Sequence, residues 1–151
     1  MRSATVSPLR MIARSLALAG ALAGSACLRS TAPEPSVLQL SGTWKYAGVQ
    51  TGPVRETLTG ILTISRESGT SFQGRLDLTV TNEPTGTSSL LGGLVSGSAS
   101  GSNVIDFDAN LDTIRRHVGQ IVADTITGTW IGSAPDGTMS SGTFRVEREP
   151  R

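Results

Sequence analysis

The chain has 151 residues with 13 basic and 12 acidic side chains, a formal net charge of +1, and its length favours a single domain. Only 17% of its residues are charged and they form no large basic cluster, so we expect no nucleic-acid partner. One cysteine excludes an intrachain disulfide, and one cysteine with one histidine excludes metal sites built from clusters of these residues.

Residues 1–26 have the pattern of an export signal. Three arginines, Arg2, Arg10 and Arg14, precede residues 15–28, which carry no charge and are rich in small and apolar side chains. This uncharged run is shorter than the roughly 20 apolar residues of a membrane-spanning helix. We therefore expect residues 1–26 to be removed as a signal peptide, which leaves a slightly acidic mature chain.

The end of this segment, Ala-Gly-Ser-Ala-Cys at residues 23–27, resembles the lipobox of bacterial lipoproteins, with Gly24 where that family favours leucine. The resemblance implies cleavage before Cys27, lipid attachment to this cysteine, and a membrane as its partner. An unpaired, exposed thiol is reactive in an oxidising compartment, and lipidation removes it. Leu28, in place of aspartate, is similar to lipoproteins sorted to the outer membrane, so the implied location is the cell envelope. The alternative is ordinary signal cleavage, which leaves a free thiol.

After the cysteine, residues 27–37 are polar, contain proline and show no periodicity, which predicts a flexible tether. From residue 38 to residue 148, apolar and polar residues alternate with a period of two, which is typical of β-strands. The alternation of the sixth run is ambiguous. The eight expected strands are residues 38–46, 58–64, 72–80, 91–99, 105–111, 117–123, 126–130 and 142–146.

Turn-forming residues separate most of these runs, and short connections favour antiparallel hairpins between sequential strands. The turn signals are residues 51–53, 67–70, 82–86, 100–103 and 134–137. Eight strands with one apolar face and no covering helix form either a closed barrel or a sandwich. We favour an all-β, eight-stranded antiparallel up-and-down (meander) barrel over residues 38–148, because closure removes edge strands and no long crossover connection is evident.

A glycine recurs inside the strands in a polar-Gly-x-apolar unit, most clearly at Ser41–Trp44, Thr127–Trp130 and Ser141–Phe144. An inward glycine lets a strand coil and lets a facing ring approach the backbone, so the unit predicts barrel curvature and core packing.

The Gly-Thr-Trp that opens the first strand, followed by glycine-containing hairpins, resembles the lipocalins and the avidin group. In lipocalins this tryptophan packs against an arginine of a late strand at the closed end of the barrel. The resemblance implies that Trp44 packs against Arg145 or Arg148. The several pocket tryptophans of avidins are missing, so biotin binding is not implied.

This lipocalin-like resemblance implies a carrier of a small molecule. No charged residue is firmly assigned to the inside of the barrel, so we expect the ligand to be apolar or neutral. The candidate ligand-binding residues, which a solid barrel would use as its core, are Trp44, Trp130, Phe144, Phe107 and Phe72. The alternative is a solid barrel that acts as a structural or interaction protein of the envelope through its outer face. The oligomeric state is not indicated.

One acidic run has the initial spacing of a calcium-binding loop: Asp106, Asp108, Asn110 and Asp112. Leu111 stands where such a loop needs glycine, and His117 stands where it needs glutamate. Alternation instead predicts a solvated strand face.

The basic segment Arg115-Arg116-His117 could pair with Asp106, Asp108 or Asp112 across a hairpin. A catalytic triad would need His117 as its base, but no nucleophile elbow or phosphate-binding loop is present. We therefore expect a protein that is not an enzyme and that needs no cofactor.

Overall fold

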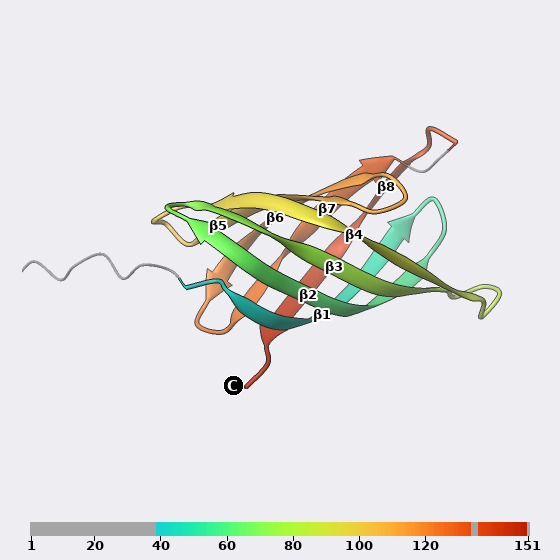
Figure 1. Cartoon of the computed structure of the whole chain (residues 1–151). Coiled ribbons are helices and arrows are strands. Elements are labelled where there is room, and N and C mark those ends of the chain that lie inside the picture. Colours follow the sequence, from blue (N-terminus) through green and yellow to red (C-terminus); the bar gives the residue numbers. More distant parts are fainter. Residues whose placement is uncertain (1–38, 134–135, 151) are drawn as a thin grey trace, which may run out of the picture. The chain divides into compact units, whose positions relative to one another are not determined.

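The predicted all-β barrel is confirmed in the computed structural model, which describes residues 39–133 and 136–150. Eight antiparallel strands follow one another and close as β8 pairs with β1 (Figure 1). The strands are β1 (Gly42–Gly52), β2 (Glu56–Ser68), β3 (Ser71–Asn82), β4 (Ser88–Ala99), β5 (Val104–Asn110), β6 (Ile114–Val122), β7 (Thr125–Ser133) and β8 (Met139–Arg148).

The expected signal peptide, Cys27 and the tether of residues 27–37 lie outside the described residues. Within the part of the chain that the structure describes, no helix is long and apolar enough to cross a membrane.

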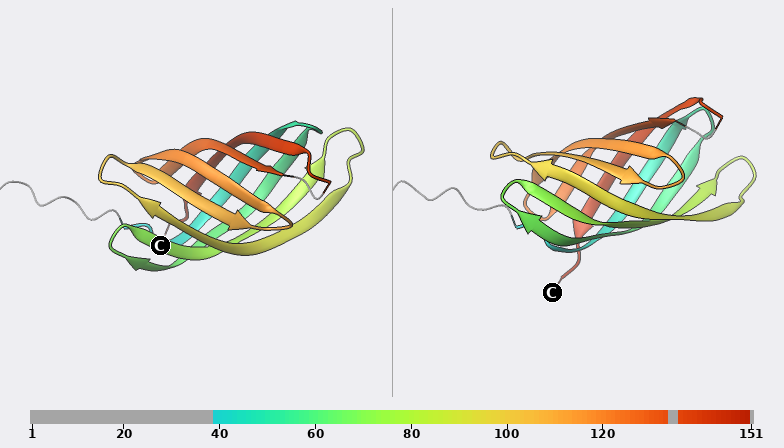
Figure 2. Two further views of the ribbon diagram at one scale, coloured as in Figure 1. Left: turned by 90° about the horizontal axis from the view of Figure 1, so that it is seen from above. Right: turned by 45° about the horizontal axis from the view of Figure 1, so that its top comes forward.

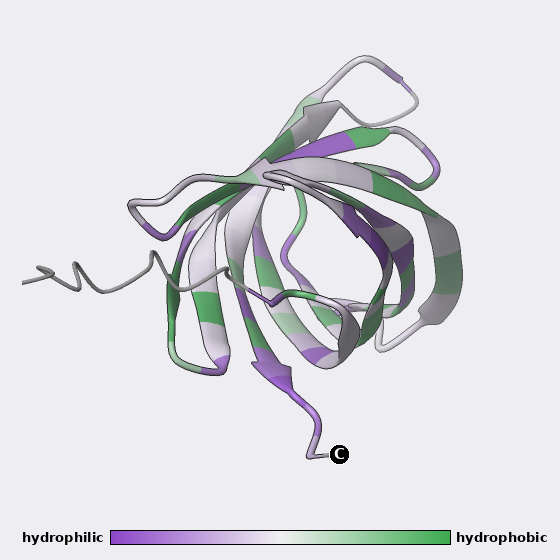
Figure 3. Ribbon diagram, turned by 60° about the vertical axis from the view of Figure 1, so that its left-hand side comes forward, coloured by the Kyte–Doolittle hydropathy of each residue, from purple (hydrophilic) through white to green (hydrophobic). Residues whose placement is uncertain are grey.

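Strict alternation builds the barrel wall, as the sequence pattern predicts. On β3, Phe72, Leu76 and Leu78 are buried inside, whereas Gln73 and Arg75 between them are exposed. Figure 3 shows the resulting bands of hydrophobic and hydrophilic residues along the ribbons. All connections between strands are short, so each sequential pair forms a hairpin (Figure 2). Five of the seven connections coincide with or overlap a predicted turn signal, whereas the β5–β6 and β6–β7 connections had no predicted signal.

Inward glycines allow the strands to approach closely, as predicted. A Cβ atom at Gly60 would lie 2.0 Å from the backbone oxygen of Asp77 on β3. A Cβ atom at Gly142 would lie 2.0 Å from the backbone oxygen of Val49 and 2.8 Å from the Trp130 ring. No side chain fits at either position without displacing a neighbouring strand.

Strand β6, whose alternation is ambiguous in the sequence, places a charged residue inside the barrel. Arg115 and His117 are buried inside, and Ile114, Val118 and Val122 on the opposite parity are exposed. Hydrophobicity alone would place Ile114, Val118 and Val122 inside the barrel and Arg115 and His117 outside. Its register is instead fixed by its neighbours, because His117 pairs with Phe107 on β5 and with Trp130 on β7, both of which face inward.

Strand β4 is paired on both sides over only part of its length. It pairs with β3 from Ser88 to Ser98, but its described pairing with β5 covers only Leu94 to Ala99. Residues 88–92 therefore form a free edge, in the part of the hairpin that extends beyond its neighbours (Figure 2). Leu90 on this segment is 82% exposed.

Candidate functional site

The two ends of the barrel are built differently, and each contains a tryptophan with an arginine stacked on it. We call the end where β1 begins and β8 finishes the Trp44 end, and the opposite end, formed by the β1–β2, β3–β4, β5–β6 and β7–β8 connections, the Trp130 end (left and right in Figure 1).

The Trp44 end is closed by the chain itself. Trp44 is fully buried, and its indole Nε1 donates a hydrogen bond of 2.9 Å to the Leu40 carbonyl. The Arg148 guanidinium lies 4.1 Å from the Trp44 ring centroid. Its Nη1 donates to the Ser41 carbonyl at 2.9 Å, and its Nε donates to Asp124 Oδ1 at 3.0 Å.

The same end is held from the other side by a carboxylate. Glu67 accepts hydrogen bonds from the backbone N–H groups of Leu40, at 2.5 Å, and of Ser41, at 3.0 Å. Burial alone would raise the pKa of Glu67, but the hydrogen bonds from the Ser41 hydroxyl and from the backbone N–H groups of Leu40 and Ser41 favour the ionised carboxylate, and together with the charge of Arg148 they lower this pKa. Of the two arginines expected as possible partners of Trp44, Arg148 is therefore the one that packs on its ring, since Arg145 faces outward and pairs with Glu147.

The middle of the barrel is filled by aromatic rings. Phe107 stacks on His117 with ring centroids 4.4 Å apart, and contacts Phe72 and Phe144 edge-on at 6.1 Å and 5.8 Å. Tyr46 stacks on Phe144. Three of the five predicted ligand-binding rings, Phe72, Phe107 and Phe144, therefore lie together in this central layer, whereas Trp44 and Trp130 belong to opposite ends.

His117 is neutral and its tautomer is fixed by its neighbours. Nδ1 lies 3.0 Å from the Arg115 carbonyl, which only accepts, so Nδ1 carries the proton. Nε2 then accepts from the Tyr46 hydroxyl at 3.2 Å. Burial lowers the pKa of His117 to about 4 and raises the pKa of Tyr46, so both side chains are uncharged at neutral pH.

The Trp130 end contains polar side chains inside the barrel that the chain does not fully satisfy. Gln50, Arg115 and Ser140 are buried there, as is Trp130. Gln50 Nε2 donates to the Val54 carbonyl at 3.0 Å, and Ser140 Oγ to the Gly132 carbonyl at 3.3 Å.

The Arg115 guanidinium lies 4.9 Å from the Trp130 ring centroid, and its Nη2 reaches Asp112 Oδ1 at 3.4 Å. Its Nε and Nη1, and Trp130 Nε1, are buried and have no hydrogen-bond partner among the described residues. A buried donor without an acceptor costs roughly 1–3 kcal/mol, and more when the donor is charged. Three such donors at one end of the barrel make this end the candidate site.

The acidic run of the calcium hypothesis is divided between separate ion pairs. Asp106 faces outward and accepts from Arg116 Nε at 3.1 Å, which lowers the pKa of this carboxyl group. Asp112 faces Arg115. Two of the predicted cross-hairpin pairs are thereby confirmed. In the described ranges, no three acidic, cysteine or histidine side chains come together as a metal site.

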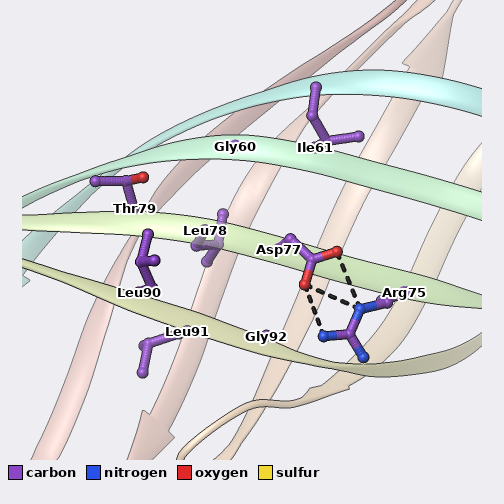
Figure 4. Close-up of a pocket in the computed structure, with 9 residues that line it drawn as sticks. All are labelled: Gly60, Ile61, Arg75, Asp77, Leu78, Thr79, Leu90, Leu91 and Gly92. Carbon is purple, nitrogen blue, oxygen red and sulfur yellow. Dashed lines mark hydrogen bonds and ion pairs between the residues drawn. The ribbon is translucent and has the colours of Figure 1, made fainter.

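A groove lies on the outer surface over β2, β3 and β4 (Figure 4). This groove has a volume of about 350 Å³, and Ile61 and Leu90 supply its apolar walls. Arg75 and Asp77 form an ion pair of 2.8 Å beside Gly92, and both side chains are more than half exposed. Because these charges satisfy each other in solvent, the groove lacks the unmet hydrogen-bonding need of the Trp130 end.

Sequence reasoning identified Trp130 as a candidate but missed Arg115, Gln50 and Ser140. For Gln50 and Ser140 the signal was available, since Gln50 continues the inward parity of Trp44 and Tyr46, and Ser140 that of Gly142. For Arg115 the signal was a glycine on the neighbouring strand, because Gly132 of β7 lies opposite Arg115. A Cβ atom at Gly132 would lie 3.0 Å from Arg115 Cγ, so the glycine makes room for the long side chain.

No protein-family model matches this chain, and no curated protein matches its sequence. Among solved structures, the chain is similar to EF1p2_mFAP2b bound to DFHBI, with a TM-score of 0.61 and 13% identity over 73% of this chain and 94% of that one. It is similar to the redesigned β barrel mFAP1 bound to DFHBI, with a TM-score of 0.56 and 15% identity over 72% and 94%. It is also similar to a de novo designed fluorescence-activating β barrel, with a TM-score of 0.55 and 14% identity over 76% and 98%. At these identities the likeness is one of fold.

Proposed function

We propose that the chain is an exported, lipid-anchored protein of the cell envelope whose barrel binds a small molecule at the Trp130 end. The observation that carries the binding proposal is the set of three buried N–H donors, on Arg115 and Trp130, without a partner among the described residues. A barrel with a purely structural role gains nothing from such groups, whereas a binding site uses them to orient its ligand.

The fold supports the same proposal. Eight-stranded barrels have an interior that is either just filled by side chains or holds one small ligand. Two of the similar structures are bound to DFHBI, which supports a fold of this kind accommodating a small molecule. In the present chain the central rings fill the middle, and the described buried polar side chains outside this layer, Gln50, Arg115 and Ser140, lie towards the Trp130 end.

Binding is tested by native mass spectrometry of the full chain purified from a bacterial host. We expect a co-purifying small molecule that is lost in Trp130→Ala and kept in Arg116→Gln, which changes only an exposed ion pair. A ligand-free mass, together with unchanged intrinsic tryptophan fluorescence across a panel of apolar ligands, would contradict the proposal.

Anchoring through Cys27 is tested by labelling cells with a palmitate analogue. We expect the full chain to be labelled and membrane-bound, and Cys27→Ser to be unlabelled and released. Labelling that persists in Cys27→Ser would show that the lipobox interpretation is wrong.

The free edge of β4 favours a second function, protein interaction by strand addition. Residues 88–92 have no described backbone pairing on one side, carry no charge, and include the exposed Leu90. If this edge is the working surface, photo-crosslinkers placed at Ser89 should capture a partner that crosslinkers at Thr127, on the outer face of the fully paired β7, do not capture.

A further inference from the structure

The unsatisfied atoms at the Trp130 end are of one chemical kind. Within the described residues, the buried side-chain nitrogen and oxygen atoms that lack a partner are Arg115 Nε, Arg115 Nη1 and Trp130 Nε1. All three are donors, and none can accept a hydrogen bond. The molecule that completes this site must therefore bring acceptor atoms.

The charge of the site is positive. A guanidinium stays protonated in proteins, so Arg115 brings a full charge into the barrel, where its side chain is 7% exposed. Asp112, its one described acidic partner, is 31% exposed and 3.4 Å away, longer than a good charged hydrogen bond. The other buried polar side chains on this side of the barrel, His117, Tyr46, Gln50 and Ser140, are neutral.

The Trp44 end shows what a completed version of the same arrangement looks like. There the arginine also lies on a tryptophan ring, but backbone carbonyls of residues 39–41 accept from Arg148 and from Trp44 Nε1, and Asp124 balances the charge. In that case the chain supplies its own acceptors. At the Trp130 end the described chain supplies only Asp112, and two donors of Arg115 and the indole remain for another molecule.

The opposite wall of the same end is apolar. Leu58, Leu78 and Val80 of β2 and β3 point inward there, and Leu91 and Leu111 beside them are only partly buried, so this wall meets solvent at the end of the barrel. One charged donor group facing an apolar wall suits a molecule with one negative charge and an apolar body. Arg55, in the β1–β2 connection at this end, is 65% exposed and already pairs with Glu83 at 2.8 Å, so among these two arginines a doubly charged phosphate would find unused buried donors only on Arg115.

We propose that the Trp130 end binds a small apolar carboxylic acid in its anionic form, with the carboxylate on the Arg115 guanidinium and Trp130 Nε1 and the apolar body towards Leu58 and Leu78. A planar guanidinium matches the two oxygens of a carboxylate side by side. This assignment rests on the proposed small-molecule function and replaces the expectation of an apolar or neutral ligand.

The test compares decanoate with decanol, which share the apolar chain and differ in the head group, by calorimetric titration of the full chain. We expect decanoate to bind roughly tenfold or more tightly than decanol, the difference that one charged hydrogen bond makes. Arg115→Gln should lower the affinity for decanoate to the level of that for decanol, and it should leave the affinity for decanol unchanged. Arg116→Gln, its neighbour on the outer face, should bind decanoate like the parent chain.

A thermal melt of each variant separates binding from folding. Because Arg115→Gln removes a buried charge that lacks full compensation, we expect its ligand-free melting temperature to equal or exceed that of the parent chain. If decanol binds the parent chain as tightly as decanoate, or if a well-folded Arg115→Gln keeps its preference for decanoate, the carboxylate assignment is wrong while small-molecule binding stands. If neither compound binds, the carboxylate assignment is also wrong, and the mass-spectrometric test decides the proposed function by itself.

Discussion

The buried His117 predicts a specific loss of stability in mild acid. Its pKa is lowered from 6.5 to about 4, first by burial and further by the charge of Arg115, against the hydrogen bond to the Arg115 carbonyl. Between these two values the unfolded chain binds a proton that the folded chain does not. The free energy of unfolding therefore falls as the pH is lowered through this window.

The expected magnitude follows from the two pKa values. Going from pH 7.5 to pH 4.5 should remove about 2.5 kcal/mol, a large part of the stability of a domain of this size. The chain has one histidine, so no other imidazole contributes in this range. The carboxyl groups of Glu67, Asp106 and Asp136 have lowered pKa values, and their contributions are lost mainly below pH 4.5.

The assay is urea denaturation of the full chain at several pH values, compared with His117→Gln. Glutamine keeps an acceptor for the Tyr46 hydroxyl and does not titrate, so the variant should be less stable at pH 7.5 yet nearly flat down to pH 4.5. Equal pH dependence of both chains would refute the buried, neutral His117 and with it the described register of β6.

Three further predictions use matched pairs of substitutions and the same denaturation assay. Trp44→Phe should lower the free energy of unfolding by about 1–3 kcal/mol, because it leaves the Leu40 carbonyl without its donor. Trp130→Phe should lower the free energy of unfolding by less, because it removes a donor that has no described partner. Gly60→Ala should destabilise the barrel by about 1–3 kcal/mol or more, since its Cβ would lie 2.0 Å from the Asp77 oxygen, and Gly52→Ala, where nothing lies within 4 Å, should not. Saturating decanoate should raise the unfolding midpoint of the parent chain and not that of Arg115→Gln. Equal losses within either substitution pair, or equal stabilisation by decanoate, would contradict these interpretations.

The barrel could be predicted from the sequence because alternation, turn residues and inward glycines agree with one another over most strands. On β3, for example, every second residue from Phe72 to Val80 is apolar or glycine, and the outward residues are polar. Short connections then leave few topologies other than a meander. The choice between Arg145 and Arg148 needed the structure, because both lie near the end of β8 and only side-chain direction separates them.

The charged part of the candidate site could not be predicted from alternation, because it lies on a strand whose inward residues are less hydrophobic than its outward ones. On β6, Arg115 and His117 face the interior while Ile114 and Val118 face solvent. The pairing partners of a strand outweigh its own hydrophobicity when all of its neighbours are already oriented. Such local conflict between pattern and fold concentrates at functional positions, since a chain selected for stability alone would exchange these residues.

The two ends of the barrel use the same arginine–tryptophan pair in different ways. Both ends stack an arginine on a buried tryptophan, so the motif by itself is compatible with a stable barrel. At the Trp44 end the preceding chain segment returns over the ring and supplies carbonyl acceptors, which fixes that end as a structural plug. At the Trp130 end the strands are joined by hairpins, and the described parts of these hairpins supply one distant carboxylate. The same pair of side chains therefore closes the barrel at one end and presents unused donors at the other.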